Sequence, residues 1–217
     1  MSTLKATKRK LRQDIKRLLA DVPPEVARSQ CGRLKCICSQ RCWTDSFHLA
    51  SAAVKTLLSM TQYHSAQKLS VYLSMPTGEI STVAIVHDAM NRGKQVFVPY
   101  TYKIAEEIES QPSQIMDMLE LKSLEDYASL EPDKWGIPTL SADSVASRRN
   151  SFGGFGTSDG KTSENSFGLD MIVVPGMAFD RNMGRLGHGK GFYDYFFERC
   201  HRQSVQGRTK MPFLGMI

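Results

Sequence analysis

The most informative stretch of this sequence is Gly184-Arg185-Leu186-Gly187-His188-Gly189-Lys190-Gly191-Phe192-Tyr193-Asp194. It follows the apolar run 171–176, which predicts a buried strand, and precedes an aromatic segment at 192–199 that predicts a helix. Glycines between a strand and a helix let backbone N–H groups converge on an anion, and the helix N-terminus adds partial positive charge. The stretch therefore predicts a phosphate-binding loop.

Two well-known phosphate loops do not fit this stretch. Gly184 to Lys190 has the Walker A spacing up to its lysine, but Gly191 stands where that pattern needs Ser or Thr for Mg²⁺. A dinucleotide-binding loop needs a following βαβ unit with an acidic ribose ligand, for which the sequence leaves no room. A loop that serves only to turn is the simpler alternative, yet glycines alternating with His188 and Lys190 exceed what a turn needs.

Asp194, in the first turn of the predicted helix, has two interpretations. The helix dipole favours a carboxylate there without any ligand. Beside a bound polyphosphate, however, a bare carboxylate would repel the ligand unless Mg²⁺ lay between them. We prefer the interpretation of Asp194 as a metal ligand.

The rest of the chain alternates helical patterns with short apolar strands. Leucine and isoleucine recur at helical spacing near the N-terminus, where Lys8 and Arg12 share a different face. The order predicts an α/β fold, one domain with a largely parallel sheet flanked by helices and the glycine loop between a strand and a C-terminal helix. The other predicted elements are helices over 45–63 and from Ser81 or Thr82 to Gly93, and strands over 69–73 and 95–99.

The segment after the strand 69–73 should lie close to the glycine loop, because the carboxyl ends of parallel strands meet at one edge of a sheet. It carries Leu73, Ser74, Met75 and Glu79. Taken alone, Glu79 is equally well interpreted as a loop acid near a helix start.

The glycine stretch, with 174–180 before it, resembles the signature of the 5-formyltetrahydrofolate cyclo-ligases, also called methenyltetrahydrofolate synthetases. Three shorter stretches agree in order: the basic motif 8–12, Leu73-Ser74-Met75 with Glu79-Ile80, and Lys134-Trp135-Gly136-Ile137-Pro138. The resemblance covers most of a single domain, 1–217. Its exceptions are insertions at about 29–44 and 141–168 and the C-terminal end, where the family continues to a second metal-binding acid.

The resemblance implies ATP- and Mg²⁺-dependent cyclisation of 5-formyltetrahydrofolate to 5,10-methenyltetrahydrofolate, with release of ADP and phosphate. Catalysis would fall to Lys190, Arg185 and His188, and Mg²⁺ binding to Asp194. The implied ATP-binding residues are Lys8, Arg9, Lys10, Leu11, Arg12, Arg185, Leu186, Gly187, His188, Gly189, Lys190, Gly191, Phe192 and Tyr193. The implied folate-binding residues are Leu73, Met75, Glu79, Trp135, His188, Gly189, Lys190, Gly191 and Phe192.

Several features depart from the family pattern or are open to a second interpretation. His188 and Phe192 differ mildly from the residues usual there. Trp135 is interpreted as stacking on the pterin or as a buried structural side chain.

Two further segments have no counterpart in the family pattern. The first contains Cys31, Cys36, Cys38 and Cys42, which lack the C-x₂-C pairs of common structural zinc sites, so we expect no metal there. The Ser- and Gly-rich segment 141–168 predicts a mobile loop or spacer, with Arg148, Arg149 and nearby serines as an alternative phosphorylation site.

Composition bounds the class of protein and its partners. The net charge of +6 over 217 residues suits anionic ligands such as ATP and a folate with a glutamate tail, with or without further glutamates. No nucleic-acid motif, membrane-length apolar run or secretory signal core occurs. We expect a cytoplasmic monomer, with a mitochondrial location as the alternative because no acid precedes Asp14.

Two other functions remain open from the residues alone. One is a sugar-phosphate isomerase or acyl transferase on a similar scaffold, because a fold does not fix a function. The other is a folate- or nucleotide-binding protein that lacks catalysis. An isomerase would need no ATP, and a pure binder would release no phosphate.

Overall fold

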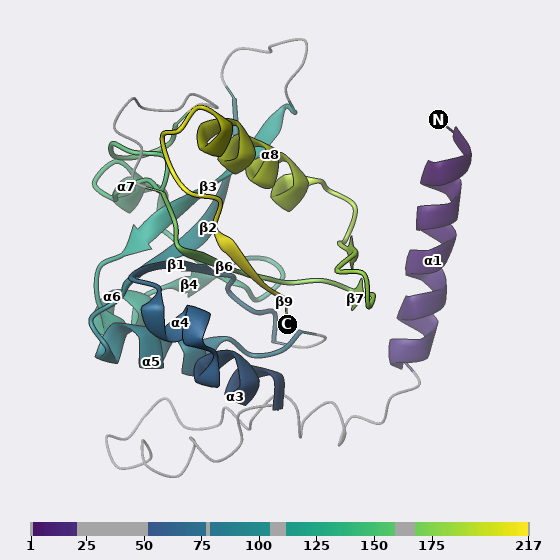
Figure 1. Ribbon diagram of the computed structural model, residues 1–217, viewed down its shortest axis with the longest axis horizontal. Coiled ribbons are helices and arrows are strands. Elements are labelled where there is room, and N and C mark those ends of the chain that lie inside the picture. Colours follow the sequence, from purple (N-terminus) through teal and green to yellow (C-terminus); the bar gives the residue numbers. More distant parts are fainter. Residues whose placement is uncertain (1, 21–51, 77–78, 105–111, 159–167, 217) are drawn as a thin grey trace.

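The computed structural model describes residues 2–20, 52–76, 79–104, 112–158 and 168–216 (Figure 1). The cysteine cluster, the insertion predicted at 29–44 and the part of the predicted helix before residue 52 lie outside the described residues. The described helices are α1 (Ser2–Ala20), α3 (Ala52–Ser59), α4 (Thr61–Ser65), α5 (Val83–Asn91), α6 (Leu124–Ala128), α7 (Ala142–Val145) and α8 (Phe192–Val205).

A mixed, mostly parallel sheet forms the centre of the molecule. Its order is β3-β2-β1-β6-β9, with β1 parallel to β2 and β6, β6 parallel to β9, and β3 antiparallel to β2 at one edge. The predicted fold class is therefore confirmed. The bounds are β1 (Lys68–Val71), β2 (Gln95–Lys103), β3 (Gln114–Leu121), β6 (Met171–Val174) and β9 (Phe213–Met216), besides the two-stranded pairs β4 (Glu131–Pro132) with β5 (Pro138–Thr139) and β7 (Ala178–Phe179) with β8 (Arg185–Leu186).

Alternation along the central strands builds one core on each face of the sheet. On β6, Met171 and Val173 join the core under α3, α4 and α5, whereas Ile172 and Val174 join the core under α8. Successive side chains of a strand point to opposite faces, so a strand covered on both faces is apolar at every position. Figure 1 shows α8 on one side of the sheet and α3 to α5 on the other.

The helix predicted over 45–63 is interrupted within its described part. Helix α3 ends at Ser59 and α4 begins at Thr61, because Met60 between them has an extended backbone. Thr82 precedes α5 as predicted, but its hydroxyl donates to the Tyr72 carbonyl (2.6 Å) instead of capping the helix. Gly93 follows α5 with a positive φ of 73°, a conformation that favours glycine.

The N-terminal helix α1 lies beside the β7–β8 pair, away from the helices that cover the sheet (Figure 1). It is basic and amphipathic as predicted, with Leu11 exposed and Arg12 half-buried. No helix in the described part of the chain is long and apolar enough to cross a membrane.

The prediction of a mobile spacer is wrong for residues 141–158. Arg148 is 4% exposed and forms two hydrogen bonds of 2.6 Å with the Asp126 carboxylate, which hold the pKa of Asp126 below its usual value. Asn150, Ser151 and Phe152 are also buried. A buried, ion-paired Arg148 does not suit a phosphorylation motif either. Residues 159–167 lie outside the described ranges.

A buried ion pair joins α8 to the edge strand β3. The Arg199 guanidinium donates to the Asp117 carboxylate at 2.8 Å, and both side chains are almost completely buried. Asp117 also accepts from Asn150 Nδ2 and Tyr102 Oη, each at 2.9 Å, and the Arg199 guanidinium lies 3.9 Å from the ring centre of Phe152. The segment 148–158 is therefore fixed by polar contacts with β3 and α8.

We expect Asp117→Asn to lower the free energy of unfolding by about 3–5 kcal/mol, because it leaves the Arg199 charge buried without its counter-ion. Urea unfolding followed by circular dichroism would measure the loss. Glu198→Gln is the matched control, since it removes an exposed ion pair with Arg202 on the same helix and should change stability little. Equal losses in both variants would contradict a special role for the buried pair.

Candidate active site at the carboxyl edge of the sheet

The pairing of β1 with β6 brings two predicted site segments to one edge of the sheet. The strands are parallel, with Val71 opposite Val173, so the chain leaves both at the same edge. The segment from Leu73 to Glu79 follows β1, and the segment that leads to the glycine loop follows β6. The prediction that the two segments leave the sheet at one edge is confirmed.

Hydrogen bonds shape the segment that follows β1. Glu79 Oε2 accepts from the Met75 backbone N–H at 2.9 Å, which folds the carboxylate back over the turn. Tyr72 Oη donates to the Ile80 carbonyl at 2.7 Å and closes the segment at its base. Leu73 is buried in the core, whereas Met75 and Glu79 are partly exposed at the edge. Met75 and Glu79 are thus accessible to a ligand.

The tryptophan motif, 134–138, packs on the segment from Leu73 to Glu79 that follows β1 (the β1 segment). Asp133 accepts from the backbone N–H groups of Trp135 (2.8 Å) and Ile137 (3.0 Å), which forms a tight turn. Gly136 has φ +78°, and a Cβ there would lie 2.7 Å from Pro76 Cγ. Trp135 is 64% exposed, with Lys134 Nζ 4.2 Å from its ring centre, so it is not a buried structural side chain.

The chain between β6 and α8 forms a small hairpin, and the first part of the glycine stretch is the second strand of this hairpin. Strands β7 and β8 pair, and Asp180 holds their turn by accepting from the N–H groups of Asn182 (2.8 Å) and Gly184 (2.7 Å). The chain then passes the exposed residues His188 and Lys190 before α8 begins. The predicted position between a buried strand and a helix holds, with the hairpin inserted.

The backbone of this loop favours glycine at two positions. Gly189 and Gly191 have φ of +97° and +76°, and Gly191 precedes the first turn of α8. A Cβ on Gly187 would lie 2.9 Å from Arg185 Nη1, and one on Gly189 would lie 3.2 Å from Arg12 Cζ. The loop thus presents its backbone close to two guanidinium groups, as a phosphate-binding loop would.

Arg12 connects the N-terminal basic motif to the glycine loop. Its Nε donates to the Gly187 carbonyl at 2.9 Å across 175 positions of sequence. Lys8 lies one helical turn earlier on the same face of α1, and Lys8, Arg9 and Lys10 are exposed. Two basic motifs that the sequence predicts for ATP therefore lie next to each other.

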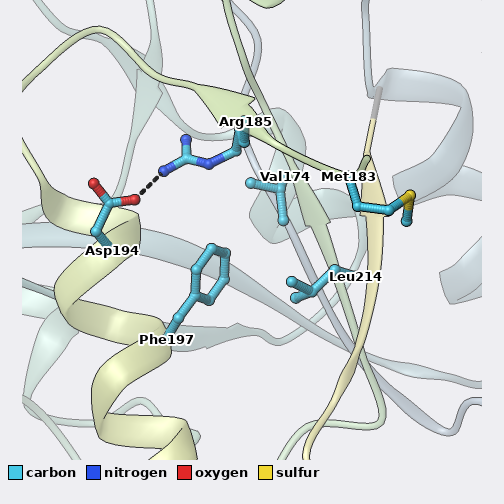
Figure 2. Close-up of a pocket in the computed structure, with 6 residues that line it drawn as sticks. All are labelled: Val174, Met183, Arg185, Asp194, Phe197 and Leu214. Carbon is cyan, nitrogen blue, oxygen red and sulfur yellow. Dashed lines mark hydrogen bonds and ion pairs between the residues drawn. The ribbon is translucent and has the colours of Figure 1, made fainter. Parts of the chain in front are cut away.

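Arg185 and Asp194 form an ion pair at the wall of a cavity of about 250 Å³ (Figure 2). Arg185 Nη2 donates to Asp194 Oδ1 at 2.7 Å, and Nη1 donates to the Pro175 carbonyl at 3.1 Å. The side chain of Asp194 is 77% exposed, and its Oδ2 makes no hydrogen bond within the described ranges. The residues that line the cavity are Val174, Met183, Arg185, Asp194, Phe197 and Leu214.

The donor set at Asp194 fits Mg²⁺ held jointly with phosphate. No group of three or more His, Cys, Asp or Glu side chains suited to a metal occurs among the described residues. Mg²⁺ is commonly held by one or two carboxylates plus the phosphates of a substrate, and it keeps several waters. One exposed carboxylate beside a glycine loop meets that requirement, whereas a metal site built from protein ligands alone would not form here.

Tyr193 lies between the glycine loop and the end of β1. Its ring packs against both cores, with the Arg185 guanidinium 5.3 Å and the Phe197 ring 5.9 Å from its centre. Burial raises the pKa of Tyr193, the Glu79 carboxylate raises it further, and Arg185 lowers it. The side chain is therefore within electrostatic reach of the β1 segment.

Several residues that organise this edge could not be singled out from the sequence. Asp133 and Asp180 each hold a turn with a glycine three or four positions later, a pattern that the sequence contains but that is too common to be specific. Pro76 and Pro175 act through packing and a backbone carbonyl, for which no sequence signal exists. Of the residues predicted to bind folate, Leu73 has its side chain in the core. The predicted residues Lys8 to Leu11 lie on α1, outside the sheet.

A mostly parallel α/β sheet with a glycine loop beyond its carboxyl edge is an arrangement typical of proteins that bind a phosphorylated ligand. Residues 4–216 match the model of the 5-formyltetrahydrofolate cyclo-ligase family. The chain therefore belongs to this family.

Curated relatives carry the same family name. The chain is 32% identical over 158 residues to 5-formyltetrahydrofolate cyclo-ligase of Mus musculus, an alignment that covers 72% of this chain and 64% of the mouse protein. The probable enzyme of Schizosaccharomyces pombe is 26% identical, with the same two coverages. The chain thus spans less than two thirds of both relatives. The probable enzyme of Caenorhabditis elegans is 28% identical over 100% of this chain and 84% of its own length.

A solved structure supports the fold. The chain resembles the NMR structure of Aquifex aeolicus 5,10-methenyltetrahydrofolate synthetase with a TM-score of 0.50 and 20% identity. The match covers 88% of this chain and 72% of that chain.

We expect Gly136→Ala to destabilise the protein more than Gly93→Ala. Both residues have φ near +75°, where a Cβ costs about 1–2 kcal/mol, but a Cβ at Gly93 meets nothing within 4 Å. At Gly136 the new methyl would also press on Pro76 and displace the tryptophan turn from the β1 segment. Denaturant unfolding of both variants measures the difference. Equal losses would show that Pro76 does not hold the turn.

Proposed function

We propose that this chain catalyses the ATP- and Mg²⁺-dependent cyclisation of 5-formyltetrahydrofolate to 5,10-methenyltetrahydrofolate, releasing ADP and phosphate. The formyl oxygen accepts the γ-phosphoryl group of ATP, N10 attacks the activated carbon, and phosphate leaves. The convergence of the Arg12 motif, the glycine loop and the β1 segment at one edge, in a chain of this family, carries the proposal.

The polyphosphate of ATP is assigned to the cationic side of the edge. Arg12 contacts the glycine loop, and His188 and Lys190 lie within it. The charges of Arg12 and Lys190 would neutralise the phosphates, and the His188 ring could donate a hydrogen bond to them. The supporting residues for ATP are Lys8, Arg9, Lys10 and Leu11 on α1 and Leu186 to Phe192 around the loop. Positioning and charge neutralisation are what phosphoryl transfer requires of a protein.

The folate is assigned to the β1 side of the same edge. The Glu79 carboxylate would accept from N–H groups of the pterin, and Met75 with the exposed ring of Trp135 would contact its flat face. The glycine loop closes the space between the folate and ATP. Both substrates would then lie within reach of each other, as direct transfer to the formyl oxygen demands.

Arg185 is proposed to act mainly through Asp194. Its guanidinium is held by Asp194 and Pro175 and lies near the rings of Tyr193 and Phe197. Because these neighbours hold its guanidinium, Arg185 can follow a moving phosphate less freely than Lys190 can. Asp194 would hold Mg²⁺, which when bound supplies positive charge to the β- and γ-phosphates.

The net charge of +6 also suits folates with additional glutamates. A cytoplasmic monomer is our expectation, although a relative from Arabidopsis thaliana is named as mitochondrial.

The decisive experiment follows methenyltetrahydrofolate by its absorbance after mixing the protein with 5-formyltetrahydrofolate. We expect product with ATP and Mg²⁺ together and none when either is omitted, with one phosphate released per product. Folate binding without phosphate release would favour a binding protein, and turnover without ATP would contradict the proposal.

Lys190→Ala should weaken ATP use, since loss of a charge-assisted contact costs about 1.5–3 kcal/mol.

We expect Asp194→Asn to raise the Mg²⁺ concentration for half-maximal activity roughly tenfold or more, because a neutral amide cannot offset the charge of the metal. Asp180→Asn is the matched control: it changes another exposed carboxylate nearby, and an amide oxygen can still accept the N–H groups of Asn182 and Gly184. Mg²⁺ titration of product formation measures both variants. Equal Mg²⁺ dependence in the two would remove Asp194 as the metal ligand.

A further inference from the structure

The hydroxyl of Tyr193 is a buried polar group without a partner. Tyr193 Oη is inaccessible to solvent and makes no hydrogen bond to any described residue. A buried hydroxyl in that condition costs about 1–3 kcal/mol, so a site that retains one needs a reason other than stability. A ligand that supplies the missing hydrogen bond is such a reason.

The surroundings of Tyr193 indicate which ligand its hydroxyl would bind. The ring packs against both cores, at the point where α8 begins and where β1 and β6 end. Glu79, on the β1 side, acts electrostatically on the hydroxyl. Arg12, which marks the ATP side, instead contacts Gly187 and approaches Gly189. Tyr193 packs against the core cluster that contains Tyr72 and the predicted folate residue Leu73, although the resemblance assigns Tyr193 to ATP.

Tyr195 on the same helix provides a comparison, because its hydroxyl is also buried but has a different electrostatic neighbour. Its Oη is also buried and without a partner among the described residues. Its electrostatic neighbour is Arg202, farther along α8, rather than Glu79. The two tyrosines therefore share the same polar deficit but face different parts of the molecule.

We propose that Tyr193 is a substrate-binding residue, whose hydroxyl donates a hydrogen bond to a carbonyl oxygen of the folate while the Glu79 carboxylate accepts from N–H groups of the same ligand. The phenol of tyrosine is protonated at neutral pH and can donate. The Tyr193 hydroxyl as donor and the Glu79 carboxylate as acceptor would together fix the orientation of the pterin ring, which carries both carbonyl and N–H groups. This inference rests on the proposed function and moves Tyr193 from the ATP side to the folate side.

The test is Tyr193→Phe, which removes the hydroxyl and keeps the ring. We expect the Kd for 5-formyltetrahydrofolate, measured by calorimetry without nucleotide, to rise about five- to tenfold. The Kd for ATP with Mg²⁺ should change less than twofold. The melting temperature should stay the same or rise, because the variant no longer buries an unpaired hydroxyl. A purely structural role would instead lower the melting temperature.

Tyr195→Phe is the matched control and should preserve the melting temperature, the folate affinity and the ATP affinity. A double-mutant cycle sharpens the assignment. Tyr193→Phe and Glu79→Gln should affect folate binding non-additively, because they contact the same ligand, whereas Tyr195→Phe and Glu79→Gln should be additive.

Two results would overturn the inference while leaving the proposed function in place. One is a wild-type folate Kd in Tyr193→Phe, and the other is a loss of ATP affinity without a loss of folate affinity. A wild-type protein that neither binds 5-formyltetrahydrofolate nor forms product would overturn the proposed function, and the inference with it.

Discussion

The buried ion pair between Arg199 and Asp117 fixes the helix on which the candidate site depends. Arg199 lies two turns after the start of α8, whose first turn carries Tyr193 and Asp194. The same carboxylate accepts from Asn150 and Ser158, so β3, α8 and the segment before residue 159 share one charged centre. Two buried charges are tolerated only when each satisfies the other, which leaves α8 a single position on the sheet.

Parallel pairing sets the other boundary of the site. Because β1 and β6 run side by side, the β1 segment and the glycine loop must leave the sheet at the same edge. Packing then refines the arrangement, as Gly136 on Pro76 brings the tryptophan turn to the β1 segment. Arg12 adds the cationic motif from a helix that otherwise lies apart from the sheet. Strand pairing and two local contacts thus connect four segments that are far apart in sequence.

The largely parallel sheet and the position of the glycine loop between a strand and a helix could be predicted because their signals are local. Apolar runs, glycine spacing and a family resemblance need no knowledge of distant partners. Residues 141–158 could not be predicted, since Arg148 and Asn150 look like linker residues until their partners Asp126 and Asp117 are known. The buried, unpaired hydroxyl of Tyr193 also could not be predicted, because a glycine-loop motif does not reveal where the next ring packs.

The distribution of charge at the edge explains how one loop can serve two ligands. Arg185 is held by Asp194 and by the Pro175 carbonyl, so this cation and this acid largely compensate each other. The net positive charge towards the loop then comes from Arg12 and the exposed Lys190. On the β1 side, Glu79 and the hydroxyl of Tyr193 provide neutral-to-acidic hydrogen-bonding groups. In the proposed function, this distribution would attract a polyphosphate to the first side and leave the second side for a ligand with N–H and carbonyl groups.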